Sequence, residues 1–183
     1  MAASAIHAVS VENPAREVDD FDALVRLYWP RVFRFALASL RDRDAAQTLA
    51  QDCFLRAYRA RAGFRGEASI STWLMQIAVN LARDYGRSRK LQFWKRAQPL
   101  ERGWSPGVEA DPETQALMNE QVQAVWNATV GLSDRQRTVF LLRFVEDMEL
   151  LEISAVTGLS ENAVKVHLFR AVRAVRKRMG REA

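Results

Sequence analysis

The sequence predicts an all-α protein made of two small helical domains joined by an extended linker, the C-terminal domain being a helix-turn-helix. Apolar residues recur with a helical period over most of 21–90 and 113–179, and alternation is too weak to predict a sheet anywhere. Residues 91–112 contain three prolines and two glycines and show no period, which is typical of a linker. The expected division is a mobile tail at 1–18, domains at 19–92 and 112–183, and a linker at 93–111.

The first domain is expected to begin with a helix that passes through Pro30. Its apolar residues are Phe21, Leu24, Val25, Leu27, Tyr28, Val32, Phe33, Phe35 and Leu37. A second helix begins at Asp42 or Asp44, because Asp is a favoured N-cap. Its apolar face consists of Ala46, Leu49, Ala50, Cys53, Phe54 and Ala57. Small and polar residues predict a loop over 63–71, and a long helix then begins at Ser71 or Thr72.

The second domain is helical from residue 113, restarts at Ser133 and ends in two helices joined by a short turn. The first of the two spans 149–157 and closes at Gly158, a residue that suits the left-handed position after a helix. Ser160 suits the N-cap of the next helix. Two helices with so short a connection predict a helix-turn-helix.

The last helix has an apolar face and a basic face. The apolar residues are Val164, Leu168, Ala171, Val172, Val175 and Met179. The opposite face carries Asn162, Val166, Phe169, Arg170, Arg173, Arg176 and Lys177. Such a helix fits the major groove of DNA, where cations meet phosphates and exposed tips reach base edges. A solvated basic face is the alternative interpretation, but the turn and the helix before it favour DNA binding.

Composition and charge limit the classes of function that the protein can have. The net charge is +5, and basic clusters at 83–103 and 160–183 flank an acidic stretch at 105–152, a pattern that suits nucleic-acid contact at two places. No apolar run approaches the ~18–20 residues of a membrane span, and no secretory signal is visible. The single cysteine fits a reducing cytoplasm. We find no metal-ligand spacing, no GxGxxG, P-loop or GxSxG motif, and therefore expect no enzyme and no cofactor.

Three motifs carry a family resemblance. QDCFLRAYRA and FRGEASISTWLMQIAVN resemble the core domain of extracytoplasmic-function (ECF) sigma factors of bacterial RNA polymerase. The matching residues are Gln51, Asp52, Phe54, Arg56, Ala57, Tyr58, Arg59, Phe64, Gly66, Thr72, Trp73, Leu74, Ile77, Ala78 and Asn80. LSDRQRTVFLL with ISAVTGLSENAVKVHL is similar to the last domain of sigma factors and equally to LuxR-type response regulators. The N-terminal half decides for the sigma factor, because the strand–helix alternation of a receiver domain is absent.

The resemblance implies that the loop after Gly63 holds a flipped base of the minus-ten promoter element and that the following helix contacts its neighbours. The minus-ten candidates are Phe64, Arg65, Ser69, Asn80, Arg83, Arg87 and Lys90. Trp73 is interpreted as core packing. Bases held outside a duplex need an apolar wedge, a pocket and cations for the backbone, which these residue types supply.

The resemblance also implies a helix that docks on the clamp of the polymerase β′ subunit. The polymerase-binding candidates are Gln51, Asp52, Arg56 and Arg59. An ordinary solvated helix with an Asp52–Arg56 pair is the alternative. Thr48 stands where the family often has an acidic residue.

The minus-thirty-five reader corresponds to the last helix. Its candidates are Asn162, Lys165, Val166, Phe169, Arg170 and Arg173, with Arg173 added from the helical wheel. Asp147 and Leu150 replace a family Gly-aromatic-acidic feature that precedes the helix-turn-helix.

The sequence thus predicts a sigma factor that directs core polymerase to promoters and helps to open the minus-ten element. The expected partners are core polymerase through its β′ clamp, promoter DNA as duplex and single strand, and an anti-sigma factor, with no membrane insertion. A stand-alone LuxR-like regulator is the alternative within DNA binding. A helical adaptor that binds only protein is another, but it would not need two basic clusters.

Overall fold

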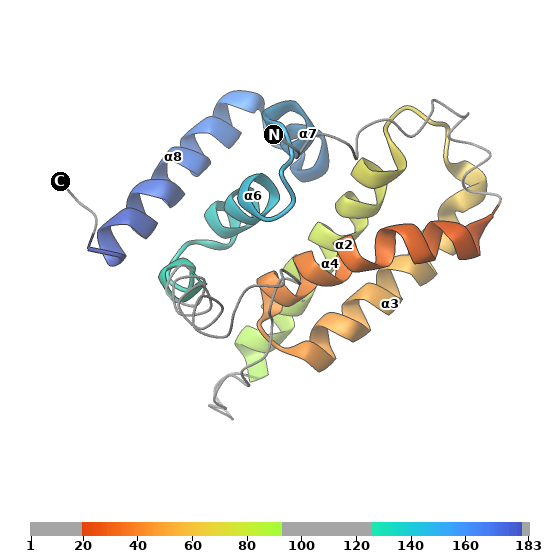
Figure 1. Cartoon of the computed structure of the whole chain (residues 1–183), viewed down its shortest axis with the longest axis horizontal. Helices are drawn as coiled ribbons and strands as arrows, with labels where there is room; N and C mark the ends of the chain where they lie inside the picture. Colours follow the sequence, from red (N-terminus) through yellow and green to blue (C-terminus); the bar gives the residue numbers. More distant parts are fainter. Residues whose placement is uncertain (1–19, 93–125, 181–183) are drawn as a thin grey trace, which may run out of the picture.

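The computed structural model describes residues 20–92 and 126–180, apart from the side chains of 87–92. The described residues contain helices and turns and no strand, which confirms the all-α prediction. Figure 1 shows α2, α3 and α4 as one group and α6, α7 and α8 as another. The predicted tail at 1–18 and linker at 93–111 lie outside the described residues. No helix within the described ranges is long and apolar enough to cross a membrane.

Helix α2 (Phe21–Leu40) runs unbroken through Pro30, as predicted. Asp20 caps its start by accepting a hydrogen bond from the Ala23 backbone N–H (3.1 Å). Apolar residues at helical spacing bury one side of α2, but Leu27 is 66% exposed. Its place in the apolar pattern therefore does not make it a core residue.

Helix α3 (Arg43–Ala60) begins after Asp42, the first of the two predicted caps, whose carboxylate accepts from the Ala45 backbone N–H (2.9 Å). All six predicted apolar residues of this helix are buried. The Cys53 thiol lies 3.5 Å from the Leu74 carbonyl oxygen, and burial raises its pKa to about 12. Cys53 is therefore a core residue with no thiolate to offer at neutral pH.

A short 3-10 turn, η1 (Arg61–Gly63), leads to a loop and then to α4 (Ile70–Gln92). Helix α4 starts one or two residues before the predicted Ser71 or Thr72. The reason is that the Ser69 hydroxyl accepts a hydrogen bond from the Thr72 backbone N–H (3.1 Å), so Ser69 closes the first turn. Three hydroxyl residues within four positions made the cap ambiguous from sequence.

The second group begins with a helical segment at 126–129, followed by α6 (Asp134–Phe144). Ser133 and Gln136 form a reciprocal capping box at the start of α6. Before the helix-turn-helix, Asp147 has a φ of 50°, a left-handed conformation that Asp tolerates better than most residues.

Helices α7 (Leu150–Thr157) and α8 (Glu161–Arg178) form the predicted helix-turn-helix. Gly158 has a φ of 70° in the turn, and the Ser160 side chain accepts from the Ala163 backbone N–H (3.3 Å). The predicted roles of Gly158 at the end of α7 and of Ser160 as the N-cap of α8 are therefore confirmed. At the other end of α8, Arg178 donates to the Ala128 carbonyl oxygen (2.8 Å) and ties that end to the segment before α6.

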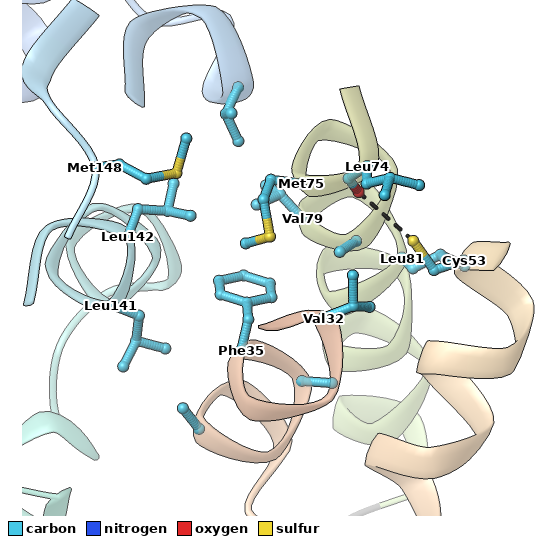
Figure 2. Close-up of a cluster of buried hydrophobic side chains, with 14 of the residues drawn as sticks. Val32, Phe35, Cys53, Leu74, Met75, Val79, Leu81, Leu141, Leu142 and Met148 are labelled. Atoms are coloured by element: carbon cyan, nitrogen blue, oxygen red, sulfur yellow. Dashed lines mark hydrogen bonds between the residues drawn. The ribbon is translucent and has the colours of Figure 1, made fainter. Parts of the chain in front are cut away.

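The two groups of helices pack directly on each other, with α6 against α2 and α7 against α4 (Figure 1). Figure 2 shows Phe35 and Met75 of the first group facing Leu142 and Met148 of the second. All four side chains are buried. The two groups therefore share one continuous apolar core, which the sequence pattern did not predict.

Candidate nucleic-acid and polymerase interfaces

The outer face of α8 presents the predicted DNA-contacting side chains to solvent. Asn162, Val166, Phe169, Arg170 and Arg173 are all exposed, whereas the apolar residues on the opposite side of the helix are buried or half-buried. Phe169 is 68% exposed, although burying a ring of this size would be favourable by about 1.5–3 kcal/mol. A large apolar group left among arginines suits a surface that a ligand covers.

Lys165 lies at the margin of this face and already has a partner. Its ammonium group is 2.6 Å from a Glu161 carboxylate oxygen, one helical turn earlier. A half-exposed i,i+4 pair of this kind contributes little to stability, so a phosphate can compete for the lysine.

Helix α4 presents a second polar surface beside the first domain core. Asn80 and Arg83 are exposed, while Ala78, Val79 and Leu81 around Asn80 are buried. Asn80 is therefore a neutral amide held on a rigid helix, with its donor and acceptor groups facing solvent. Arg87 and Lys90 lie farther along α4, and their side chains fall outside the described residues.

The loop before α4 is held by local contacts. Phe64 is half-buried against Trp73, with ring centroids 4.8 Å apart, so the two aromatic rings form one wall. Arg65 and Ser69 are exposed, but the Ser69 hydroxyl also lies 2.8 Å from that of Thr72. Trp73 is half-buried, which agrees with packing rather than free exposure.

Sequence reasoning missed Gln76, which lies one turn before Asn80 on the same side of α4. Its side-chain amide donates to the Ala155 carbonyl oxygen of α7 (2.7 Å). The spacing of Gln76 and Asn80 shows that they share a face of the helix, because residues at i and i+4 are neighbours. Nothing in the sequence indicated that α7 would pack against this part of α4.

The polar face of α3 differs in one respect from the prediction. Gln51, Arg56 and Arg59 are exposed, but Asp52 is only half-buried rather than turned fully to solvent. Of the residues that the structure describes, Asp52 and Arg56 form no ion pair with each other. The Asp52 carboxylate instead adds to the effect of burial in raising the pKa of Tyr85 on α4.

Two apolar residues also interrupt the polar face of α3. Leu55 is 48% exposed and Tyr58 is 45% exposed, and the Arg61 guanidinium carbon lies 3.5 Å from the Tyr58 ring centre. This mixture of apolar area and cations is what protein interfaces use. Leu55 and Tyr58 both lie outside the predicted apolar face of this helix. Their position in the helical pattern therefore could have predicted that they are exposed.

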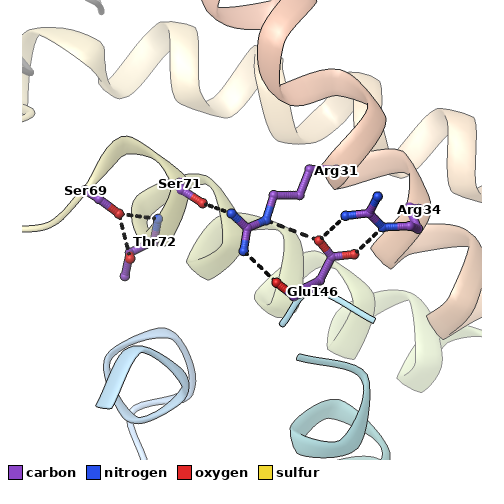
Figure 3. A network of polar contacts seen from close by, with 6 residues as sticks. All are labelled: Arg31, Arg34, Ser69, Ser71, Thr72 and Glu146. Carbon is purple, nitrogen blue, oxygen red and sulfur yellow. Dashed lines mark hydrogen bonds and ion pairs between the residues drawn. The ribbon is translucent and has the colours of Figure 1, made fainter. Parts of the chain in front are cut away.

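A polar cluster joins the two groups of helices (Figure 3). The Glu146 side chain is fully buried, and its carboxylate accepts from Arg31 Nε (3.2 Å), Arg34 Nε (3.0 Å) and Arg34 Nη2 (2.9 Å). Arg31 also donates to the Glu146 carbonyl oxygen (3.1 Å) and to the Ser71 hydroxyl (2.6 Å).

Burial and ion pairing have opposite effects on the pKa of Glu146. Burial raises the pKa of Glu146, and the two guanidinium groups offset only part of that effect. The hydrogen bond to Glu146 raises the pKa of Arg34. Neither sequence motif nor local spacing indicated this contact, because its partners are 112 and 115 residues apart.

Comparison with known proteins identifies the family. A family model for Sigma-70 region 2 matches residues 24–92, and one for Sigma-70 region 4 matches residues 123–175. The ECF RNA polymerase sigma-E factor of Escherichia coli K12 is 30% identical over 162 residues, a match that covers 85% of this chain and 84% of that protein. The chain belongs to the ECF family of RNA polymerase sigma factors.

Other relatives of this sigma factor are also named as sigma factors. SigW, an ECF sigma factor of Bacillus subtilis, is 28% identical over 167 residues, covering 88% of this chain and 89% of its own. A longer protein of Xanthomonas campestris, named as a probable RNA polymerase sigma factor (RfaY), is 34% identical over 149 residues. That match covers 81% of this chain, which spans 37% of the longer protein.

Two solved structures have a similar fold. One is the sigma factor RpoE of Bartonella quintana, solved in complex with the anti-sigma factor NepR; it has a TM-score of 0.68, 20% identity, and coverage of 90% of this chain and 99% of its own. The other is CnrH in complex with the cytosolic domain of CnrY; it has a TM-score of 0.68, 21% identity, and coverage of 93% and 96%. The family is one of non-catalytic transcription initiation factors.

Proposed function

We propose that this sigma factor directs core polymerase through three surfaces: α8 for the minus-thirty-five element, α4 with its preceding loop for the minus-ten element, and α3 for the β′ clamp. The observation that carries the proposal is the pair of exposed polar faces on α4 and α8, each backed by buried apolar residues. We assign no catalysis and no cofactor to the chain and expect it to act in the cytoplasm.

The α8 face has the chemistry for a major groove. Arginine can bind the O6 and N7 atoms of guanine with two hydrogen bonds, and an apolar side chain can contact the thymine methyl group. Arg170 and Phe169 are adjacent and exposed, so they are our candidates for base contact. Lys165 and Arg173, which flank them on the same face of α8, are our candidates for phosphate contact.

The α4 face has the chemistry for a melted strand. The Asn80 amide can donate to and accept from a base edge, and Arg83 on the next turn can neutralise a phosphate. The joined Phe64 and Trp73 rings supply an apolar wall beside the loop. Base stacking on aromatic rings is typically favourable by ~1–3 kcal/mol per base, which offsets part of the cost of unstacking.

An anti-sigma factor is the further partner that we propose. It is the class of partner named for a similar-fold relative, the sigma factor RpoE. Leu55 and Tyr58 on the outer face of α3 are exposed and could contact either polymerase or an antagonist. If both partners bind this surface, they cannot bind at the same time.

In vitro transcription tests the proposed function. The purified full chain is added to core polymerase on a genomic fragment library, and the expected result is initiation at a discrete set of promoters that share two spaced elements. A chain that binds duplex DNA tightly by itself and leaves initiation by core polymerase unchanged would instead be a stand-alone regulator.

Asp52→Lys tests the role of α3. Asp52 is half-buried, and it forms no ion pair with any residue whose side chain the structure describes. Such surface charges are typically worth ~0–1 kcal/mol, so the melting temperature should change little. A reversed charge in a docking surface costs several kcal/mol, so affinity for core polymerase should fall at least about tenfold.

Asp44→Lys at the exposed start of α3 is the matched control, because it makes the same charge change two turns away. An affinity of Asp52→Lys for core polymerase within twofold of wild type would remove the clamp role from this face.

Asn80→Ala should impair promoter opening and leave polymerase binding intact, because the amide is on α4 and the clamp surface on α3. Permanganate footprinting of the open complex measures the first, and a β′ pull-down the second. A failed pull-down with an unchanged melting temperature would contradict this division of roles.

Arg170→Ala should weaken recognition of the minus-thirty-five element by ~1–3 kcal/mol if the guanidinium contacts a base with two hydrogen bonds. If it contacts only phosphate, affinity should fall equally on all sequences and the salt slope should drop by about one. Filter binding of holoenzyme to promoter variants at several salt concentrations separates the two. Transcription equal to wild type at limiting promoter contradicts both.

A further inference from the structure

An acidic residue stands at the tip of the helix that we propose for the minus-thirty-five element. Glu161 is the first residue of α8 and the one acidic residue within that helix, whose other charged residues are all lysines and arginines. In helix-turn-helix proteins the N-terminal residues of the second helix reach the base edges of the major groove. Attraction to DNA phosphates therefore cannot explain a carboxylate at this place.

Local structure fixes the backbone of Glu161 and does not use its side chain as a cap. The Ser160 hydroxyl accepts the hydrogen bond from the Ala163 backbone N–H (3.3 Å), so the capping position is already filled. A carboxylate in the first turn interacts favourably with the helix dipole, which accounts for it in a free helix. The dipole does not offset the repulsion that the same carboxylate meets when α8 approaches a polyanion.

The Glu161 carboxylate is paired in the free protein, but the pair can exchange. One of its oxygens lies 2.6 Å from the Lys165 ammonium nitrogen, and the two side chains are 40% and 52% exposed. A phosphate that takes Lys165 leaves the carboxylate without its cation. The carboxylate then needs a hydrogen-bond donor from the DNA, because a polar group that an interface covers without a partner is costly.

The base edges differ in whether they can supply that donor. Guanine presents only the acceptors O6 and N7 in the major groove, and thymine presents the acceptor O4 and a methyl group. Cytosine presents the N4 amino group, with no acceptor beside it on its own edge. Adenine presents an amino group next to the acceptor N7, which repels the second carboxylate oxygen. A carboxylate at this position therefore favours cytosine.

We propose that Glu161 is a specificity-determining residue that accepts a hydrogen bond from the N4 amino group of a cytosine in the minus-thirty-five element. Lys165 leaves the carboxylate for a neighbouring phosphate when the complex forms, so the ion pair of the free protein is exchanged for two contacts with DNA. This inference deepens the proposed role of α8 and rests on it.

A base-pair scan of the promoter tests this contact. Holoenzyme binding is measured on all single base-pair variants of a minus-thirty-five element found by the transcription assay, at constant salt. The wild-type holoenzyme should prefer cytosine about tenfold over guanine and thymine at one position. Glu161→Gln should lose that preference and favour adenine there instead, because glutamine can bond the N6 and N7 atoms of adenine together.

Two further variants separate base contact from indirect effects. Asp147→Asn is the matched control for charge, because it removes one carboxylate from the same group of helices, on a side chain that is 98% exposed, and it should leave the preference at every position unchanged. Lys165→Gln should weaken binding to all variants about equally, since it removes a phosphate contact, and should keep the preference for cytosine.

The role of Glu161 is overturned if the wild-type scan shows no position that prefers cytosine, or if Glu161→Gln leaves the whole profile unchanged. It is also overturned if Lys165→Gln abolishes the same preference, since Glu161 would then act only by positioning the lysine. A wild-type holoenzyme with no preference at any position of this element would refute the proposed role of α8 as well. Preferences that persist in Glu161→Gln would refute the role of Glu161 alone.

Discussion

The relative placement of the two groups of helices depends on one buried carboxylate. The Glu146 side chain has no solvent access, and the cations that contact it among the described residues both lie on α2. An ionised carboxylate can stay in such a place only if it is paired, so the two groups must meet with Arg31 and Arg34 in register. That register then lets Met75 and Met148 complete a shared apolar core. The ion pair specifies the arrangement, and the apolar contacts supply most of its free energy.

Helix α4 illustrates how one element can serve three environments. Leu74 and Leu81 face the core, Gln76 faces α7, and Asn80 faces solvent. A helix can do this because successive residues are 100° apart, so three stripes fit around one cylinder. Because the core stripe holds α4 rigidly, the exposed amide of Asn80 keeps a fixed position, which suits the contact with a base edge that we propose for it.

Periodicity and capping chemistry predicted the helices, the helix-turn-helix and the outward face of α8, because these depend on residues three or four apart. Prediction failed where a choice depended on distant contacts. Helix α4 begins at Ile70 rather than at Ser71 or Thr72, because Ser69 is the hydroxyl residue that closes its first turn. Leu27 is exposed in spite of its place in the apolar pattern. The role of Glu146 was not predicted, because it is one of many acidic residues in its stretch. Its partners Arg31 and Arg34 are more than a hundred residues away, and the residues around them do not indicate this contact.

Opposing forces act on the three charged groups at the interface between the two groups of helices. Desolvation of Glu146 opposes its attraction to the two arginines, which is why burial still dominates the pKa of that carboxyl. If the two groups of helices were separated, hydration of the three charged groups would largely offset the lost attraction between them. The net stability of the interface therefore comes mainly from its apolar contacts.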